Sequence, residues 1–365
     1  MDPAGLAAVA TALAVAGLVV AWERYRRRQE AKAWLDSVRS VISGDPDAAI
    51  EALSDAARLR SPQAIDTYLA LGQLFRREGD LSRALRLHRN MLHGPDLTPA
   101  RRAEVERELA EDYRRSGMLA EAAEILRRLA PADPAAAVGL REVLYEGGDL
   151  AGAIEVQRAA GGAGPDPILA HLLAARARQL AGSDPSGAAE AAARAVEAHP
   201  ASADAWLATA ELRGAAGDAP GALDAVGRAL DAEPRAAPLA AAALAALPAA
   251  GAGAWLAARR QGRPDDAGLL VLEARALGRQ GLEAGALAAL RAALAVDRDE
   301  GAVLSIRELL QDPRARAAEG DLAARHALLV DVLSRPVAPP RCRRCQAAAS
   351  ARTFRCRACG AYGLI

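Results

Sequence analysis

The sequence predicts an all-α protein: an array of repeated helix pairs, with an apolar helix before it and a small four-cysteine segment after it. Three observations favour this fold class. Of the 365 residues 52% are hydrophobic and only 3% aromatic, and alanine, the best helix former, supplies much of the apolar fraction. A template of glycine and alanine recurs along the chain, and all four cysteines lie in the last 25 residues. The β-branched and aromatic runs that are typical of strands are missing.

The N-terminal segment Gly5–Trp22 carries no charge over 18 residues. As a helix it would span about 27 Å, close to the ~30 Å hydrocarbon thickness of a bilayer. A cleaved signal peptide would need positive charge before the apolar run, where "MDPA" has an acid, and a buried core helix would not explain the flanks. Trp22 and Tyr25 suit the membrane interface. The basic residues that mark the cytoplasmic side are Arg24, Arg26, Arg27 and Arg28.

We therefore expect residues 1–23 to form a transmembrane anchor, in a single-pass protein of the cell inner membrane with the bulk of the chain on the cytoplasmic side. Cytoplasmic thiols stay reduced, which argues against disulfides between the four cysteines.

Residues 24–335 contain a repeated template. In each copy of the template, a glycine is followed five residues later by an alanine. Two clear copies are "LALGQLFRREGDLSRALRLHRNML" (69–92) and "ELAEDYRRSGMLAEAAEILRRLA" (108–130). The template glycines are Gly79, Gly117, Gly148, Gly217 and Gly281, with Gly251 in a degenerate copy. The matching alanines are Ala84, Ala122, Ala153, Ala222 and Ala286, and the prolines that close units are Pro134, Pro200 and Pro234.

This template resembles the tetratricopeptide repeat, whose period of 34 residues matches the spacing of Pro200 and Pro234. Glycine allows the tight turn between the two helices, and small residues let their backbones approach. Counting the weaker flanking units at 43–53 and 319–333, we expect about eight or nine helix pairs from residue 30 to 335. An alanine-rich bundle without repeats is the alternative. A tetratricopeptide superhelix offers a groove that binds another protein.

No catalytic set is recognisable in the array. The five histidines are dispersed, and His88 and His93 are five apart and so do not share a helix face; they are expected at surface or turn positions. The P-loop and the glycine-rich dinucleotide motif are absent from the sequence. The formal net charge is zero, which gives no argument for a nucleic-acid partner, and none is expected. We expect a protein that is not an enzyme.

The C-terminal segment, residues 336–365, predicts a metal-binding tail. Two CxxC pairs separated by ten residues form a four-thiolate pattern suited to one zinc or iron ion; the ligands are Cys342, Cys345, Cys356 and Cys359. Gly360 follows the last cysteine, where a knuckle often needs positive φ, whereas Gln346 follows the first pair. The segment is too small for a core of its own, so its folding should depend on the metal. Four unrelated thiols are the alternative.

The same tail holds six arginines and no acidic residue: Arg341, Arg343, Arg344, Arg352, Arg355 and Arg357. Part of their role is to favour the thiolate form of the cysteines. The positive charge beyond what this role requires forms a candidate partner-facing patch. Membrane lipid, phosphate and an acidic protein all fit it, and the sequence does not rank them.

The combination of anchor, repeat array and four-cysteine tail resembles the lipopolysaccharide assembly protein B family. The segment 69–92, the following "DLTPARR", and the tail with Phe354 before the third cysteine and its Tyr362 to Ile365 ending carry the resemblance, which is weak over 160–335. The tail departs from the family in Gln346 and in having fewer aromatics. The resemblance implies a rubredoxin-like metal-binding tail on a tetratricopeptide protein.

The resemblance also implies a non-catalytic inner-membrane adaptor that presents the deacetylase of the lipid A pathway to a membrane-anchored AAA+ protease and organises other lipopolysaccharide enzymes. A homo-oligomer is a further expectation. Two alternatives stay open: a general tetratricopeptide scaffold for another envelope assembly machine, and a redox module in which the tail carries an iron ion.

Overall fold

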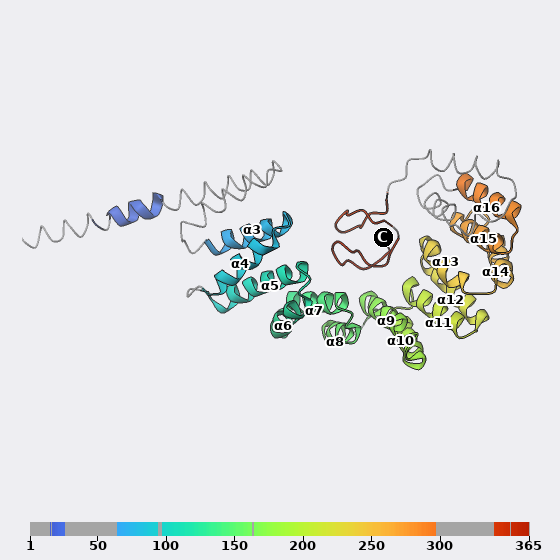
Figure 1. Cartoon of the computed structure of the whole chain (residues 1–365), viewed down its shortest axis with the longest axis horizontal. Helices are drawn as coiled ribbons and strands as arrows, with labels where there is room; N and C mark the ends of the chain where they lie inside the picture. The colour runs from blue at the N-terminus through green and yellow to red at the C-terminus, as the bar shows by residue number, and fades with distance from the viewer. Residues whose placement is uncertain are drawn as a thin grey trace, which may run out of the picture. The chain divides into compact units, whose positions relative to one another are not determined.

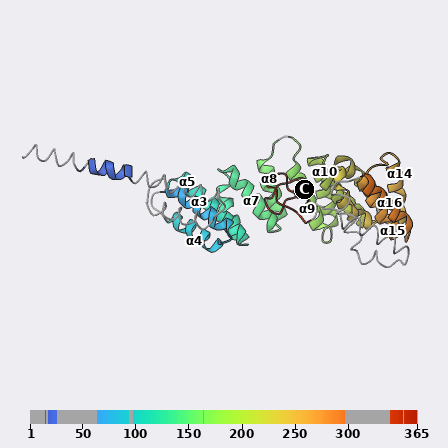
Figure 2. The ribbon, with the colours of Figure 1, turned by 90° about the horizontal axis from the view of Figure 1, so that it is seen from above.

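The computed structural model of the chain describes Val15, residues 17–25, 64–93, 97–162, 164–296, 339–350 and 352–364. The chain divides into two compact units, Met1–Gly148 and Asp149–Ile365. Each unit is built from paired helices (Figures 1 and 2). The prediction of an all-helical repeat array is confirmed for the part of the chain that the structure describes.

The described part of the array contains fourteen α-helices, which alternate along the chain as the first and second helices of the repeat template. We call the first helix of each pair an A helix and the second a B helix. The first unit contains α3 (Ala64–Arg77), α4 (Leu81–Leu92), α5 (Pro99–Arg115), α6 (Leu119–Leu129) and α7 (Pro134–Glu146). The second contains α8 (Leu150–Ala160), α9 (Pro167–Leu180), α10 (Pro185–Ala198), α11 (Ala203–Ala215), α12 (Ala219–Ala232), η1 (Pro234–Ala236), α13 (Ala237–Ala245), α14 (Ala249–Gln261), α15 (Ala267–Arg279) and α16 (Glu283–Val296).

The turns inside the pairs depend on glycine, as the template predicts. The left-handed φ angles of 75–82° occur at Gly79, Gly117, Gly148, Gly217 and Gly281. At Gly217 the chain reverses tightly, and the next residue, Asp218, donates its backbone N–H to the carbonyl of Arg213 at 2.9 Å. Asp218 then caps the B helix by accepting a bond from the N–H of Gly221 at 2.9 Å. A residue with a side chain would be strained at this φ.

The interpretation of Gly251 as a degenerate turn glycine is wrong. Gly251 lies inside α14, and the turn before this helix is made by Leu247 and Pro248 instead. Proline fixes φ near the value that the start of a helix needs, so Pro248 replaces the glycine as the device that starts the B helix. Pro134 likewise begins α7 rather than ending α6, which stops at Leu129.

The core consists mainly of alanine and leucine at the helix crossings. The template alanines Ala84, Ala122, Ala153 and Ala222 are at most 1% exposed, while Ala286 is only partly buried. In the second unit one buried cluster runs from α11 to α15 and includes Leu207, Val226 and Leu256. Neighbouring A helices also pack on each other, since α11 contacts both α9 and α13. Small side chains at the crossings therefore allow the close stacking that the repeat requires.

The predicted anchor and the flanking units lie mostly outside the described residues, which include neither 43–53, 319–333 nor Arg26 to Arg28. Val15 and residues 17–25 are helical, and their large apolar side chains range from 48% exposed at Val20 to 71% exposed at Leu18. Within the described ranges, no helix combines the length and apolar character needed to cross a membrane.

Candidate metal centre

The four-cysteine tail folds as two loops with matching geometry. In the first knuckle the N–H of Gln346 donates to the carbonyl of Cys342 at 2.9 Å, and in the second the N–H of Gly360 donates to Cys356 at 2.9 Å. An antiparallel bridge closes each loop, between Arg341 and Ala348 in one and between Arg355 and Tyr362 in the other. The repeated pattern shows that each CxxC sequence forms its own tight turn, which directs both of its sulfurs to one side.

The residue after each CxxC pair has a left-handed backbone conformation. Gly360 has φ of 69°, as expected from the sequence, and Gln346 has φ of 60°. Among the described residues Gln346 is the one non-glycine residue with positive φ. The first knuckle therefore keeps the same turn at an energetic cost, which for a residue with a Cβ is roughly 1–2 kcal/mol.

The four sulfurs come together as a candidate metal site. All four Sγ atoms lie within 4.8 Å of one another. The Sγ atoms of Cys342 and Cys359 are 3.7 Å apart, and those of Cys345 and Cys356 are 3.8 Å apart. A disulfide needs about 2.05 Å, so the cysteines are unpaired thiols. Four sulfurs at about 2.3 Å from a tetrahedral ion would lie about 3.8 Å apart. The cluster therefore fits one thiolate-bound ion.

The polypeptide surrounds the cluster unevenly. Cys342 and Cys356 are 2% and 4% exposed, whereas Cys345 is exposed and Cys359 half-buried. Backbone N–H groups of Cys345 and then Arg344 point at the sulfur of Cys342 and lower the pKa of its thiol to about 6. Desolvation raises the pKa of Cys359 to about 12. The surroundings therefore favour the thiolate form at Cys342 and oppose it at Cys359, and binding of an ion must displace protons from the site.

The tail packs on the A-helix side of the second unit (Figure 1). Phe354 packs against the buried cluster of α11–α15. The ring of Tyr362 meets that of His171 in α9 edge-on, with centroids 5.1 Å apart and an angle of 64°. The Arg355 guanidinium lies 5.8 Å from the Tyr362 ring centroid. Phe354 and Tyr362 therefore attach the tail to the array.

The six tail arginines do not form one uniform patch. Arg341, Arg343, Arg344 and Arg357 are exposed, whereas Arg352 and Arg355 are partly buried. The Nη1 atom of Arg341 donates to the Gln346 carbonyl at 3.0 Å. The pKa of Glu233 is lowered mainly by its hydrogen bond from Arg235, and the charge of Arg343 contributes to the same shift. Arg343 thus lies near enough to the array for its charge to act on Glu233, while Arg341, Arg344 and Arg357 are exposed as well.

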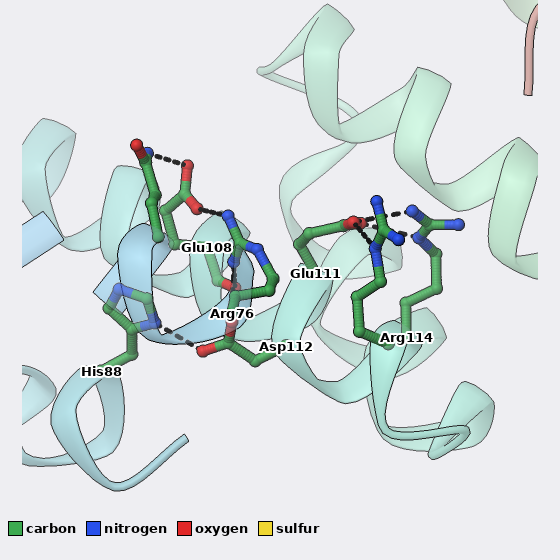
Figure 3. A network of polar contacts seen from close by, with 8 residues as sticks. Arg76, His88, Glu108, Glu111, Asp112 and Arg114 are labelled. Carbon is green, nitrogen blue, oxygen red and sulfur yellow. Dashed lines mark hydrogen bonds and ion pairs between the residues drawn. The ribbon is translucent and has the colours of Figure 1, made fainter. Parts of the chain in front are cut away.

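The expectation of a surface or turn position for His88 is wrong. His88 is fully buried on α4, where its Nδ1 lies 2.5 Å from Oδ2 of the equally buried Asp112 (Figure 3). The other oxygen of Asp112 accepts a bond from Arg76 at 2.6 Å, and Arg76 also binds Glu108 at 2.6 Å. Ala84 precedes His88 by one helical turn on the same face, and this spacing could have predicted its burial.

A second network of the same kind lies in the other unit. Nδ1 of His171 is 2.5 Å from Asp204, which also binds Arg178 at 2.8 Å. Burial alone would raise the pKa of Asp204, but the bond with His171 and the charge of Arg178 outweigh it, and the pKa of this carboxyl is lowered. Arg178 binds Glu211 as well, at 2.7 Å. Both networks tie one A helix to the next, which is a structural role.

Together these features define a scaffold of paired tetratricopeptide-type helices with a four-cysteine tail that could hold one metal ion. The chain is similar to lipopolysaccharide assembly protein B from Escherichia coli (strain K12), with 26% identity over 96 residues. The matched stretch is 26% of this chain and only 24% of that protein. The homologues from the O6:H1 and O157:H7 strains match equally well. No family model matches the chain.

Solved structures of tetratricopeptide repeat proteins align over large parts of the chain at low identity. One from Parabacteroides merdae is 19% identical, covers 74% of this chain and 93% of its own, and has a TM-score of 0.33. The C-terminal part of a repeat protein from Cytophaga hutchinsonii is 11% identical, covers 74% of this chain and 98% of its own, and has a TM-score of 0.46.

Proposed function

We propose that this protein is a non-catalytic adaptor of the inner membrane that regulates lipopolysaccharide biosynthesis. The observation that carries the proposal is the four-cysteine tail seated on a helical repeat array, in a chain similar to lipopolysaccharide assembly protein B. Repeat arrays of this kind bind other proteins through their stacked helices. The described His–Asp pairs support a scaffold, since His88 and Asp112 are fully buried and Asp112 also binds Arg76.

In this proposal the domains keep the predicted boundaries: residues 1–23 anchor the chain, 24–335 form the array and 336–365 form the metal-binding tail. The anchor fixes the array beside the bilayer, which raises the effective concentration of its partners there. The partners are a membrane-anchored AAA+ protease, the lipid A pathway deacetylase and other lipopolysaccharide enzymes. The exposed tail arginines Arg341, Arg344 and Arg357 supply a positively charged contact for one of them.

The metal has a structural role in this proposal. Cys342, Cys345, Cys356 and Cys359 hold one zinc or iron ion, which joins the two knuckles and so keeps Phe354 and Tyr362 on the array. The fit of the sulfur spacing to a tetrahedral site supports this assignment.

Affinity purification of the full chain from membranes tests the adaptor role. We expect the protease and the deacetylase to be recovered with the chain. Recovery of neither one, nor of any other lipid A enzyme, would show that the scaffold serves a different assembly.

The tail's part is tested with Cys356→Ser, compared with Ala358→Ser, which introduces the same residue into the same knuckle and keeps all four thiols. We expect Cys356→Ser alone to slow deacetylase turnover in cells. Normal turnover in the Cys356→Ser strain would contradict a role for the tail. Metal analysis of both variants shows whether the ion is lost as intended.

A further inference from the structure

The exposed side of α4 carries an unusual concentration of positive charge. Successive helical residues are rotated by about 100°, so residues at positions i, i+3 and i+6 or i+7 share one broad face. On α4 that face is exposed and polar. We call it the α4 basic face; it consists of Ser82, Arg83, Arg86, Arg89 and Asn90. It carries three arginines, and the helix contains no acidic residue.

Two of these three arginines, Arg86 and Arg89, are not neutralised by an ion pair with a described residue. Arg83 forms an ion pair with Asp80 at 2.5 Å, so it is partly neutralised. The Nε of Arg86 donates to the carbonyl of Ser82 at 3.3 Å, which leaves the guanidinium charge unpaired. Arg89 donates to the phenol oxygen of Tyr113 at 2.9 and 2.6 Å, a neutral partner that fixes the side chain without cancelling its charge. Neither Arg86 nor Arg89 forms an ion pair with any described residue.

The B helices α6, α8, α10, α12 and α14 are balanced by comparison. The sequences of α6, α8, α10 and α12 each contain at least one acidic residue among their exposed positions. The helix α14 has two arginines and no acid, but Arg259 pairs with Asp231 at 2.6 Å and Arg260 pairs with Glu273 at 2.6 Å. The unneutralised charge on α4 is therefore a local property and does not follow from the repeat.

We propose that the α4 basic face lies against the anionic headgroups of the membrane and so orients the first repeats of the array at the bilayer surface. The face is polar throughout, which suits contact with headgroups rather than insertion. The same unit of the chain carries the helical residues 17–25, whose exposed apolar side chains fit lipid. Anchored chains bring nearby basic residues within the few ångströms to ~10 Å over which the negative surface potential acts. The inference rests on the membrane anchorage of the proposed function.

The expected strength follows from the charge. Each arginine near an anionic surface contributes roughly a fivefold preference for that surface, so Arg86 and Arg89 together contribute about thirtyfold. High salt should remove most of this preference, since exposed charges are screened.

The test uses the full chain in lipid nanodiscs. A fluorescent amino acid at the exposed position Asn90 reports on α4, and the same probe at the exposed position Glu124 on α6 serves as the reference. The discs contain a headgroup-labelled quencher lipid in phosphatidylcholine, with or without phosphatidylglycerol. We expect stronger quenching at Asn90 than at Glu124 in the phosphatidylglycerol discs, and loss of the difference in high salt.

The charge is tested with the double variant Arg86→Gln and Arg89→Gln, which should lower the quenching at Asn90 to its level in neutral discs. The matched control, Arg127→Gln with Arg128→Gln, removes two exposed charges from α6 and should leave the quenching at Asn90 unchanged. Equal quenching at both probe positions, or quenching at Asn90 that does not depend on phosphatidylglycerol, would overturn the inference.

Recovery of the chain with each type of vesicle separates the two proposals. Recovery with neutral phosphatidylcholine reports the anchor alone. Recovery only with phosphatidylglycerol vesicles would reject the anchor of the proposed function, and recovery with neither would reject both proposals.

Discussion

Gln346 is the residue at which the tail departs most clearly from an unstrained turn. It has φ of 60° in the first knuckle, where Gly360 occupies the equivalent position of the second. The Gln346→Gly substitution should relieve the strain of the left-handed conformation, partly offset by the greater entropy of glycine in the unfolded chain. We expect metal affinity to rise severalfold, corresponding to about 1 kcal/mol. Competition with a chromophoric chelator measures the change.

The reciprocal substitution, Gly360→Gln, provides the control. It introduces a side chain at φ of 69° and should weaken metal binding by a similar factor. An unchanged affinity in both variants would mean that the backbone at these positions does not limit the formation of the knuckles.

The carboxyl group of Asp204 makes a pH-dependent contribution to stability. Its folded-state pKa lies below the ordinary value of 3.8, because His171 and Arg178 outweigh the effect of burial. Its contribution is therefore fully present above about pH 4 and is lost as the pH falls through the lowered pKa. In Asp204→Asn this part of the pH dependence should disappear, together with about 1–3 kcal/mol of unfolding free energy at neutral pH.

Urea unfolding over a pH series, with a chelator in every sample so that metal loss contributes equally, measures the difference between the wild type and Asp204→Asn. The difference should be constant down to about pH 4 and shrink below it. Glu190→Gln removes a carboxylate from an exposed ion pair with Arg194 and should change the unfolding free energy by less than about 1 kcal/mol. A difference that persists at the lowest pH would contradict the role given to Asp204.

At the scale of the helix, two glycines of similar appearance should respond in opposite directions to alanine. In α3 a Cβ on Gly72 would meet the ring of the buried His88, and overpacking of this kind costs roughly 1–3 kcal/mol. In α14 nothing lies within 4 Å of a Cβ on Gly251, so alanine should stabilise the helix by about 0.5–1 kcal/mol. Thermal unfolding of Gly72→Ala and Gly251→Ala measures both. A shift of both midpoints in one direction would refute this packing explanation.

The helices and turns were largely predictable from the sequence because the template records local requirements. A glycine at each tight turn is dictated by backbone φ, which depends on neighbouring residues alone, and so Gly79 and Gly217 could be assigned without a structure. The spacing from Ala84 could have predicted that His88 is buried, but it does not reveal the partner Asp112, 24 residues away, or the space over Gly72. Partners this distant leave no periodic signal. The turn at Pro248 was not predicted because the template looks for glycine, whereas here proline starts the second helix of the pair.

At the scale of the whole chain, the four thiolates were predictable from spacing, whereas the seating of the tail was not. The CxxC spacing fixes each knuckle, but the contacts of Phe354 and Tyr362 depend on surfaces contributed by α9 and the α11–α15 cluster. In the sequence these two aromatics stood out only through the family resemblance of the tail. Their contacts with the array explain how a tail with few apolar residues is held in a defined position.

Removal of the metal should therefore detach the tail without unfolding the array. Without the ion the knuckles lack the bond that joins them, while the buried cluster of Leu207, Val226 and Leu256 contains no metal ligand. We expect a strong chelator to make residues 339–364 sensitive to trypsin, whereas helicity measured by circular dichroism changes little. Phe354→Ala should increase cleavage of the tail even in the metal-loaded protein. Loss of most of the helical signal on chelation would show instead that the metal supports the whole array.

The matching geometry of the two knuckles has a consequence for how such a tail could have arisen. Each knuckle is a complete structural unit, with its own turn after the CxxC pair and its own closing bridge, at Arg341–Ala348 and at Arg355–Tyr362. A gene encoding only one of them would specify half of a tetrahedral site, which two copies of a chain could complete between them. Duplication of that short segment would bring both halves into one polypeptide, and the glutamine in one copy and the glycine in the other would then record how far the two have diverged.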